Sequence, residues 1–338
     1  MGERSQGLGR RGVWPLAVAT AAVLAAPRLA RAAPPEERAA EVAEGVFVLR
    51  GVHEDATAEN ANAIANTAFV VGREAVAVFD AGGTLRHGRL LRAAVARATD
   101  RPIRHVVVSH VHPDHSMGGA AFADLVAPGA GPGAGPGAGP GAAGLEVVAH
   151  AAFPEQMAQR RPYYEALLER EAGGVGGSAP LAPTRLLAPG EAAALDLGGR
   201  VVRVRAHPTA HTSNDLTALD AATGTLLAAD LVFAERCPSL EGSLRGWLGV
   251  LDALRGEAGV ARCVPGHGPT SLPWPGGSDD LRRYLRAVLD ETRAAVASGV
   301  DIADAPGAVA RAESLRWLLA EVYHGRNVTA AYREIEWE

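Results

Sequence analysis

The sequence predicts a layered α/β domain, in which two β-sheets pack face to face and helices cover both outer sides. Apolar strand-like segments occur in two series along the chain, and helix-like segments accompany each series. Hydrophobic residues make up 48% of the 338 residues, which is enough for a sizeable core. Strands and helices in this order pack as layers, because each sheet must cover its apolar faces.

The first series of elements begins after residue 44. Its strands are expected at four apolar runs bounded by turn residues, at 45–51, 65–72, 75–82 and 103–110. A helix is expected at 84–99, where leucines and a valine recur on one side.

The second series begins at residue 146. Strands are expected at seven short apolar runs, at 146–150, 184–190, 192–199, 200–208, 215–220, 224–231 and 261–264. Helices are expected at 151–171, 243–254 and 278–299. Ser278 is expected to cap the start of the last helix, and Gly299 its end.

The N-terminus has the pattern of an export signal. Arg4, Arg10 and Arg11 precede an apolar run of about 14 residues, which is short for a membrane span of roughly 20. Small residues before Ala33 suit a cleavage site, so residues 1–32 are expected to be a signal peptide and the protein periplasmic. The arginine pair favours the twin-arginine route. General secretion and an uncleaved anchor remain alternatives.

The expected mature chain divides into two regions. Residues 33–275 form the layered domain, and residues 276–338 form a C-terminal helical extension packed on it. A GAGP repeat at 127–144 offers no side chains to bury, so it is expected to be a surface loop. No membrane span is expected in the mature chain.

Charge and cysteine content exclude some classes of protein. Loss of residues 1–32 removes five arginines and one glutamate, so the net charge changes from −5 to −9. An acidic chain without lysine is not expected to bind nucleic acid. The two cysteines, Cys237 and Cys263, can be either a disulfide or two separate thiols.

The segment SHVHPDHSMGG at 109–119 carries the chemistry. It places His110, His112, Asp114 and His115 within six positions, directly after an apolar strand. One short loop cannot enclose a metal ion, so further ligands must come from other strand ends.

Three more candidate ligands each follow or end an apolar strand: His211, Asp230 and His267. Seven ligands are too many for one tetrahedral zinc but suit two ions that share a carboxylate. The first ion is expected to bind His110, His112 and His211. The second is expected to bind Asp114, His115 and His267, with Asp230 as the bridge.

These motifs resemble the metallo-β-lactamase superfamily, whose HxHxDH loop occurs here as HVHPDH. The resemblance runs from about residue 44 to 270 and implies an αββα sandwich with the metals at one edge. Asp80 in FDAGG matches the family's aspartate that supports a metal ligand from behind.

A narrower resemblance is to exported metallohydrolases associated with quinoprotein dehydrogenase relay systems. The segments PTAHTSNDL, ADLVFAERCPSLEGSLRGWL, VPGHGP and YHGRNVTAAYREIEWE carry it. It implies a functional link to a periplasmic quinoprotein dehydrogenase. Ser213 departs from the group's aspartate, and the GAGP insertion is unusual.

The expected protein is an exported dinuclear zinc hydrolase. Two Zn²⁺ ions would activate a bridging hydroxide that cleaves an ester, thioester or lactone in a small-molecule substrate, with Asp114 orienting the hydroxide. Iron or manganese could replace zinc. Three alternatives remain: an iron-dependent persulfide dioxygenase-like oxidoreductase, a true β-lactamase and a non-catalytic metal-binding accessory.

Substrate contacts are expected from a few residues after Asp230. Arg236 and Arg245 are candidates to bind a substrate carboxylate. Trp247 is a candidate apolar wall, as are three tyrosines, Tyr163, Tyr164 and Tyr323. His207 and His324 are expected to be structural, and His53, His87, His105 and His150 have no ligand-like context.

Overall fold

The computed structural model describes residues 38–126, 144–174 and 176–338. The expected signal peptide and nearly all of the GAGP segment lie outside these residues. The described residues belong to one compact unit, residues 32–338.

The first sheet contains seven strands that lie side by side in chain order. Neighbours from β1 to β4 are antiparallel, and neighbours from β4 to β7 are parallel. The strands are β1 (Ala40–Ala43), β2 (Val46–Leu49), β3 (Thr67–Val71), β4 (Val76–Phe79), β5 (Ile103–Val107), β6 (Glu146–His150) and β7 (Arg185–Leu187).

The second sheet has six strands in the order β13-β12-β11-β10-β9-β8. Only the β11–β12 pair is parallel. The strands are β8 (Ala192–Asp196), β9 (Val201–Ala206), β10 (Leu216–Asp220), β11 (Thr225–Phe233), β12 (Arg262–His267) and β13 (Leu272–Pro273).

Apolar side chains from both sheets form the central core layer. In β9, Val202 and Val204 point into this layer, whereas the alternate residues, Arg203 and Arg205, are exposed. This alternation follows from the two-residue period of a strand. Val48 and Val70 of the first sheet belong to the same buried cluster, so the sheets pack face to face.

Helices cover the outer face of the first sheet. They are α1 (Leu85–Ala98), α2 (Pro113–Ser116), the 3₁₀ segment η1 (Met117–Leu125) and α3 (Phe153–Glu171). Leu91 of α1 and Met157 of α3 share a buried cluster with Phe69 and Val78 of the sheet. Thr84 caps α1, because its side chain accepts a hydrogen bond from the His87 amide.

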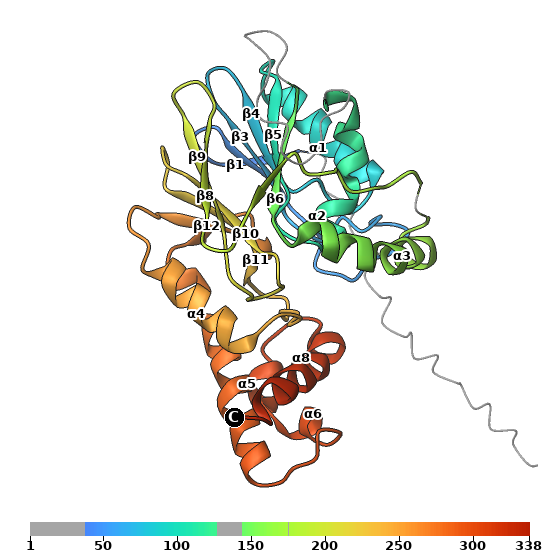
Figure 1. Cartoon of the computed structure of the whole chain (residues 1–338), viewed down its shortest axis with the longest axis vertical. Helices are drawn as coiled ribbons and strands as arrows, with labels where there is room; N and C mark the ends of the chain where they lie inside the picture. The colour runs from blue at the N-terminus through green and yellow to red at the C-terminus, as the bar shows by residue number, and fades with distance from the viewer. Residues whose placement is uncertain (1–37, 127–143, 175) are drawn as a thin grey trace, which may run out of the picture. The chain divides into compact units, whose positions relative to one another are not determined.

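The outer face of the second sheet packs against C-terminal helices. They are α4 (Leu244–Arg255), η2 (Gly276–Ser278), α5 (Asp279–Ala297), α6 (Ala305–Ala308), α7 (Arg311–Ser314) and α8 (Ala320–Ile335). Leu251, Leu285 and Val328 of this region share a buried cluster with Leu226 of β11. The layers therefore run helix, sheet, sheet, helix, and the predicted αββα sandwich is confirmed (Figure 1).

One expected cap differs from the structure. Ser278 precedes α5 but makes no cap hydrogen bond. Its hydroxyl instead donates to the Pro275 carbonyl and accepts from Arg255. Asp279 in the first turn carries the negative charge that suits a helix N-terminus. Gly299 follows the helix in the left-handed region, φ +74°, as its expected role requires.

The boundary proposed at residue 275 remains a prediction. The tail does bind the rest of the fold: Glu334 of α8 accepts hydrogen bonds from the Leu244 amide and the Ser243 hydroxyl. A search of the described helices finds none with the length and apolar character that crossing a bilayer requires.

Candidate metal centre

Four loops or strand ends meet at one edge of the sandwich and carry all seven predicted ligands. His110 follows β5, and the next three ligands lie at or in the short helix α2. His211 lies between β9 and β10, Asp230 lies in β11, and His267 ends β12. All seven residues are at most 8% exposed.

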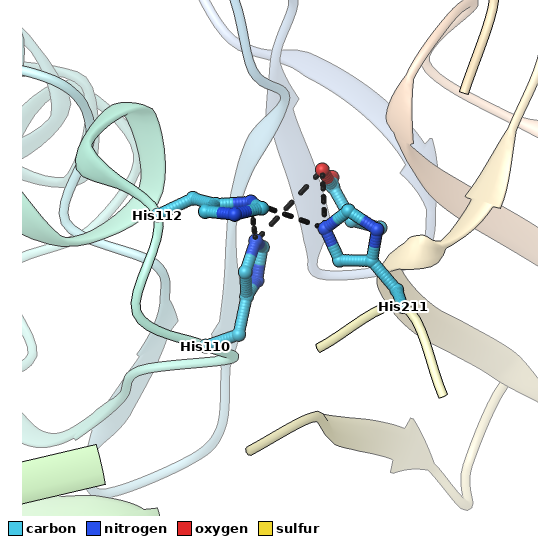
Figure 2. A group of neighbouring side chains, drawn as sticks. His110, His112 and His211 are labelled. Carbon is cyan, nitrogen blue, oxygen red and sulfur yellow. Dashed lines mark hydrogen bonds and ion pairs between the residues drawn. The ribbon is translucent and has the colours of Figure 1, made fainter. Parts of the chain in front are cut away.

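The first ligand group consists of His110, His112, His211 and Asp230, whose ligand atoms all lie within 4.8 Å of one another. Nδ1 of His112 lies 3.0 Å from Nε2 of His110 and 3.1 Å from Nε2 of His211. Figure 2 shows the three imidazoles converging on one point.

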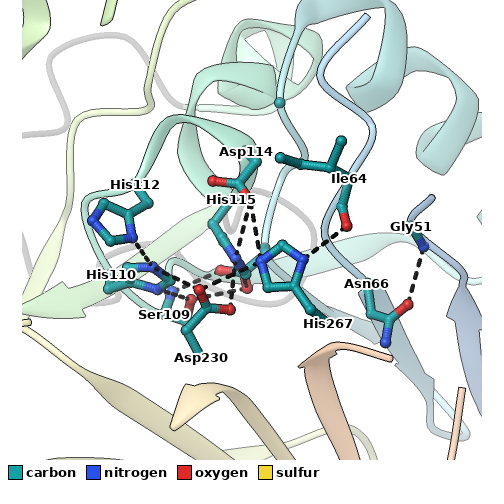
Figure 3. A network of polar contacts seen from close by, with 12 residues as sticks. Gly51, Ile64, Asn66, Ser109, His110, His112, Asp114, His115, Asp230 and His267 are labelled. Atoms are coloured by element: carbon teal, nitrogen blue, oxygen red, sulfur yellow. Dashed lines mark hydrogen bonds and ion pairs between the residues drawn. The ribbon is translucent and has the colours of Figure 1, made fainter. Parts of the chain in front are cut away.

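The second ligand group consists of Asp114, His115 and His267. Nε2 of His267 lies 3.3 Å from Oδ2 of Asp114, and Nε2 of His115 lies 3.7 Å from the same oxygen. The groups are those expected from the sequence (Figure 3).

Asp230 lies between the two groups. Its Oδ2 is 3.4 Å from Nε2 of both His211 and His267, and its Oδ1 is 3.0 Å from Nε2 of His115. One carboxylate therefore faces ligands of both groups, which is the geometry expected of a bridge.

The backbone around Asp230 is specialised for this position. The register with β12 shifts at Ala229, which adopts φ +44°, a strained conformation for a residue with a side chain. Gly266 lies opposite, where a Cβ would come within 1.9 Å of Oδ1 of Asp230. Only glycine leaves room for the carboxylate.

The ring nitrogens facing away from the centre have polar partners. Nδ1 of His211 donates to the Ser239 carbonyl at 2.7 Å, and Nδ1 of His267 donates to the Ile64 carbonyl at 2.9 Å. Such partners fix the tautomer and the ring plane, so that the opposite nitrogen presents a lone pair to a metal.

Asp80 supports the centre from behind. Its Oδ2 accepts from Nδ1 of His115 at 2.7 Å, and its Oδ1 accepts from the Ser109 amide at 2.7 Å. Asp80 is fully buried and adopts φ +65° in the turn after β4. The predicted supporting aspartate thus contacts a candidate ligand and does not belong to either ligand group.

Glu241 holds His112 from outside the centre. Its Oε1 lies 3.0 Å from Nε2 of His112, while its other oxygen is bound by Arg160 of α3. Burial tends to raise the pKa of Glu241, but His112 and Arg160 outweigh burial and hold that pKa far below its usual value. The carboxylate is therefore charged and orients the imidazole.

The residues present fit metal ions. Tetrahedral ligands at about 2.0–2.1 Å from zinc lie roughly 3.3 Å from one another, close to the separations within both groups. Buried Nε2 of His115 and Oδ1 of Asp230 make no hydrogen bond, although they lie 3.0 Å apart. Buried polar atoms without a partner are costly unless another group binds them.

The protonation states of His110, His211 and Asp230 also suit metal binding. Burial lowers the pKa of His211 to about 4 and holds that of His110 well below its usual value. Burial opposes ionisation of Asp230, but His115 and His267 hold its pKa well below the usual range. Neutral imidazoles and an ionised carboxylate are the ligand forms that bind a metal cation. At His115, burial tends to lower the pKa, but Asp230, Asp114 and Asp80 outweigh burial and raise it, so a metal ion would displace a proton there.

A cavity of about 360 Å³ opens onto the centre. His112, Asp114, Asp230 and His267 reach its wall. Other wall residues come from the loop before β3, from α3, from the segment after β11 and from α8; they include Asp55, Asn62, Ile64, Tyr163, Tyr164, Leu167, Arg170, Phe233, Arg236, Val322, Tyr323 and Arg326.

The candidate substrate contacts separate into two sets. Arg236 lines the cavity, 3% exposed, and binds Asp55 at 3.3 Å and the Tyr323 hydroxyl. Arg245 lies elsewhere, paired with Glu334 at 3.0 Å. Arg245 does not line the cavity, so the predicted substrate contact through Arg245 is not supported.

Trp247 is also a structural residue. It is fully buried, its indole N–H donates to the Leu231 carbonyl at 3.0 Å, and its ring lies 5.1 Å from that of His211. Trp247 therefore supports a ligand from the core side and is not a wall of the cavity.

The remaining histidines and cysteines have structural surroundings. His207 faces Thr217 at 2.8 Å, and His324 bonds Tyr284 at 2.9 Å, so neither belongs to a ligand group. Cys237 and Cys263 are buried free thiols, so the disulfide alternative is not supported.

Sequence reasoning missed Glu241 and the wall residues Asp55 and Arg326. The only sequence feature that could have indicated the role of Glu241 is a carboxylate 11 positions after Asp230. Nothing in the sequence indicates that Asp55 and Arg326 line one cavity with the ligands, because 270 positions separate them along the chain.

The chain is similar to a known protein family in sequence and to several solved structures in fold. A family model described as "Metallo-beta-lactamase superfamily" matches residues 62–295, which is more than half of the chain. No curated protein matches.

Among solved structures, the sec-alkylsulfatase Pisa1 from Pseudomonas sp. has a TM-score of 0.62 and 17% identity, over 87% of this chain and 49% of its own. This chain thus spans about half the length of that enzyme. A metallo-β-lactamase from Pontibacter korlensis has a TM-score of 0.55 and 14% identity, over 73% of this chain and 98% of its own.

The metallo-β-lactamase FIM-1 from Pseudomonas aeruginosa, in a mono-zinc form, has a TM-score of 0.53 and 15% identity, over 75% of this chain and 96% of its own. At identities of 14–17%, these structures show that the chain shares their fold and nothing about its substrate.

Proposed function

The chain belongs to the metallo-β-lactamase superfamily of metal-dependent hydrolases, and from this premise we propose that it is a dinuclear zinc hydrolase of an ester, thioester or lactone. The observation that carries the proposal is Asp230, whose two oxygens face His211 and His267 on one side and His115 on the other. A carboxylate shared between two ligand groups is what two neighbouring ions require.

Two zinc ions held here would supply hydroxide at neutral pH and polarise the bond to be cleaved. The residues of the chain have defined tasks around them. Asp114 reaches the cavity wall, so its carboxylate is placed to orient the nucleophile and accept its proton. Glu241 and Asp80 hold two ligating imidazoles in orientation. The cavity has apolar residues, Ile64, Leu167 and Phe233, that offer apolar contact to a substrate beside the metal centre.

The cellular setting is a further part of the proposal. We infer export to the periplasm from the arginine-led apolar segment before Ala33. A link to a quinoprotein dehydrogenase rests on the sequence resemblance alone. Expression of the full chain with fractionation tests export: a periplasmic product that begins near Ala33 supports it, and a cytoplasmic full-length product contradicts it.

A substrate panel tests the reaction. The zinc-loaded protein, its chelated form and Asp114→Asn would be assayed on thioesters, carboxylic esters, lactones, a β-lactam, a secondary alkyl sulfate and a persulfide with oxygen. The sulfate ester is included because a sec-alkylsulfatase is among the similar structures. Zinc-dependent cleavage of a carbonyl ester, lost in Asp114→Asn, is expected. Iron-dependent oxygen consumption with the persulfide, and no hydrolysis, would contradict the proposal.

A further inference from the structure

Most charged side chains on the cavity wall are paired with a neighbour of opposite charge. Asp55 binds Arg236, and Glu171 binds Arg170 at 2.7 Å. Glu241 binds Arg160 and His112, while Asp114 and Asp230 face the ligating histidines. Arg326, by contrast, makes no ion pair and no side-chain hydrogen bond in the part of the chain that the structure describes.

Arg326 is exposed and stands on the face of α8 that borders the cavity. Val322 lies one turn before it and lines the same wall, because residues four apart share a face of a helix. Leu167 and Tyr163 of α3 line the wall as well. α3 and α8 belong to different halves of the chain (Figure 1), and both border the cavity.

Two residues of the wall have donors without a partner. Nδ2 of Asn62 and Nε of Arg236 are buried and have no hydrogen-bond partner. Both residues are at most 3% exposed and line the cavity. Buried donors without a partner favour a ligand that supplies acceptor oxygens.

Part of the wall lies beyond the family match. That match covers residues 62–295, so Asp55, Val322, Tyr323 and Arg326 lie outside it. A fold does not fix a substrate, so the side chains that line this cavity must select it.

We propose that the substrate carries a carboxylate at the far end of a short apolar segment, and that Arg326 binds this carboxylate while the scissile carbonyl lies at the metal centre. The proposal rests on the proposed hydrolytic function and names its substrate class. An arginine presents a planar fork of donors that matches a carboxylate. Val322 and Leu167 provide apolar contact for the intervening carbons.

The kinetic test uses 4-nitrophenyl monoesters of linear dicarboxylic acids of increasing length. Each is compared with its methyl-capped, uncharged counterpart on the zinc-loaded full chain and on Arg326→Gln. Arg333→Gln serves as the matched control, since Arg333 is exposed on the same helix and does not line the cavity.

The expected kcat/KM preference for the charged ester is about two- to fivefold at the best chain length, the usual scale of one exposed charge pair. It should fall to about one in Arg326→Gln, remain in Arg333→Gln and weaken with added salt. A preference of the same size in Arg326→Gln, or no preference in any chain length, would overturn the proposal.

A binding measurement separates this proposal from the reaction itself. Calorimetry compares linear dicarboxylates with their monomethyl esters as ligands of the zinc-loaded protein. The wild type can bind the dicarboxylate more tightly than the monomethyl ester, lose this difference in Arg326→Gln, and still cleave no ester. In that case the proposed reaction is wrong and the carboxylate site at Arg326 is supported. Equal affinities in the wild type and Arg326→Gln would exclude the carboxylate site, whether or not esters are cleaved.

Discussion

Nδ1 of His115 lies 2.7 Å from Oδ2 of Asp80, and neither side chain is exposed to solvent. Asp80 also accepts from the amide and the hydroxyl of Ser109, next to His110. One buried carboxylate therefore orients a ligand and fixes the start of the ligand loop.

Asp80→Asn is expected to weaken zinc binding about 10- to 100-fold. The amide can keep the hydrogen bond only in part and removes the negative charge behind His115. Zinc affinity from competition with a chromophoric chelator measures this. Asp124→Asn, at an exposed ion pair with Arg92, is the control. Unchanged affinity in Asp80→Asn would contradict the supporting role.

Glu241→Gln is expected to weaken the first zinc about tenfold and to leave the second nearly unchanged, because the Glu241 carboxylate contacts His112, a ligand of the first group, and its backbone amide bonds to the carbonyl of His211 of the same group. A chelator competition titration, fitted with one affinity for each of the two zinc ions, distinguishes the two sites. Glu165→Gln, which breaks an exposed pair with Arg161 on α3, should leave both steps unchanged. If Glu241→Gln lowered the zinc affinity of both binding steps equally, Glu241 would act on the whole fold and not on His112.

Trp247→Phe is expected to lower the free energy of unfolding by about 1–3 kcal/mol, because the buried Leu231 carbonyl loses its donor and the smaller ring leaves a void. KM should change less than twofold, since Trp247 packs behind His211 and Phe233 and does not itself line the cavity. Denaturant unfolding and steady-state kinetics check both points. Trp337→Phe, at an 86% exposed tryptophan, should alter neither quantity.

His207 is expected to make stability depend on pH. Burial lowers its folded pKa to about 4, from 6.5 for the ordinary group. The stability from keeping this imidazole neutral is fully present above pH 6.5 and is lost as pH falls toward 4. Its size is up to about 3 kcal/mol.

His207→Gln should therefore lose less stability between pH 7 and pH 5 than the wild type, in urea unfolding of the chelated protein. His105→Gln, at a half-buried histidine paired with Glu146, is the comparison. Identical pH slopes in the wild type and His207→Gln would show that His207 is not the group responsible.

The sequence was sufficient for the layers and for the candidate ligands that the structure brings together. β9 alternates apolar and charged residues with the two-residue period of a strand, and β11 is a short, mostly apolar run after a turn, so both were recognisable from their own residues. His110 and its neighbours form a spacing that seldom arises without a metal. His211 and His267 were recognisable as candidate ligands only because each follows or ends an apolar strand.

Residues that act through distant contacts were not recognisable. Arg236 and Arg245 are alike in the sequence, nine positions apart, yet one lines the cavity and the other pairs with Glu334. Their difference arises from the paths of α4 and α8, which local patterns do not fix. Trp247 resembles a pocket residue until its packing against His211 is known.

The most direct test of the account is the metal content of the purified mature chain and of variants in each ligand group, by elemental mass spectrometry. The account predicts about two zincs per chain in the wild type and about one in His112→Ala and in His267→Ala. Asp230→Ala should lose more than either, because its carboxylate faces both groups. One iron per chain, unaffected by Asp230→Ala, would contradict the dinuclear centre and the hydrolytic function that rests on it.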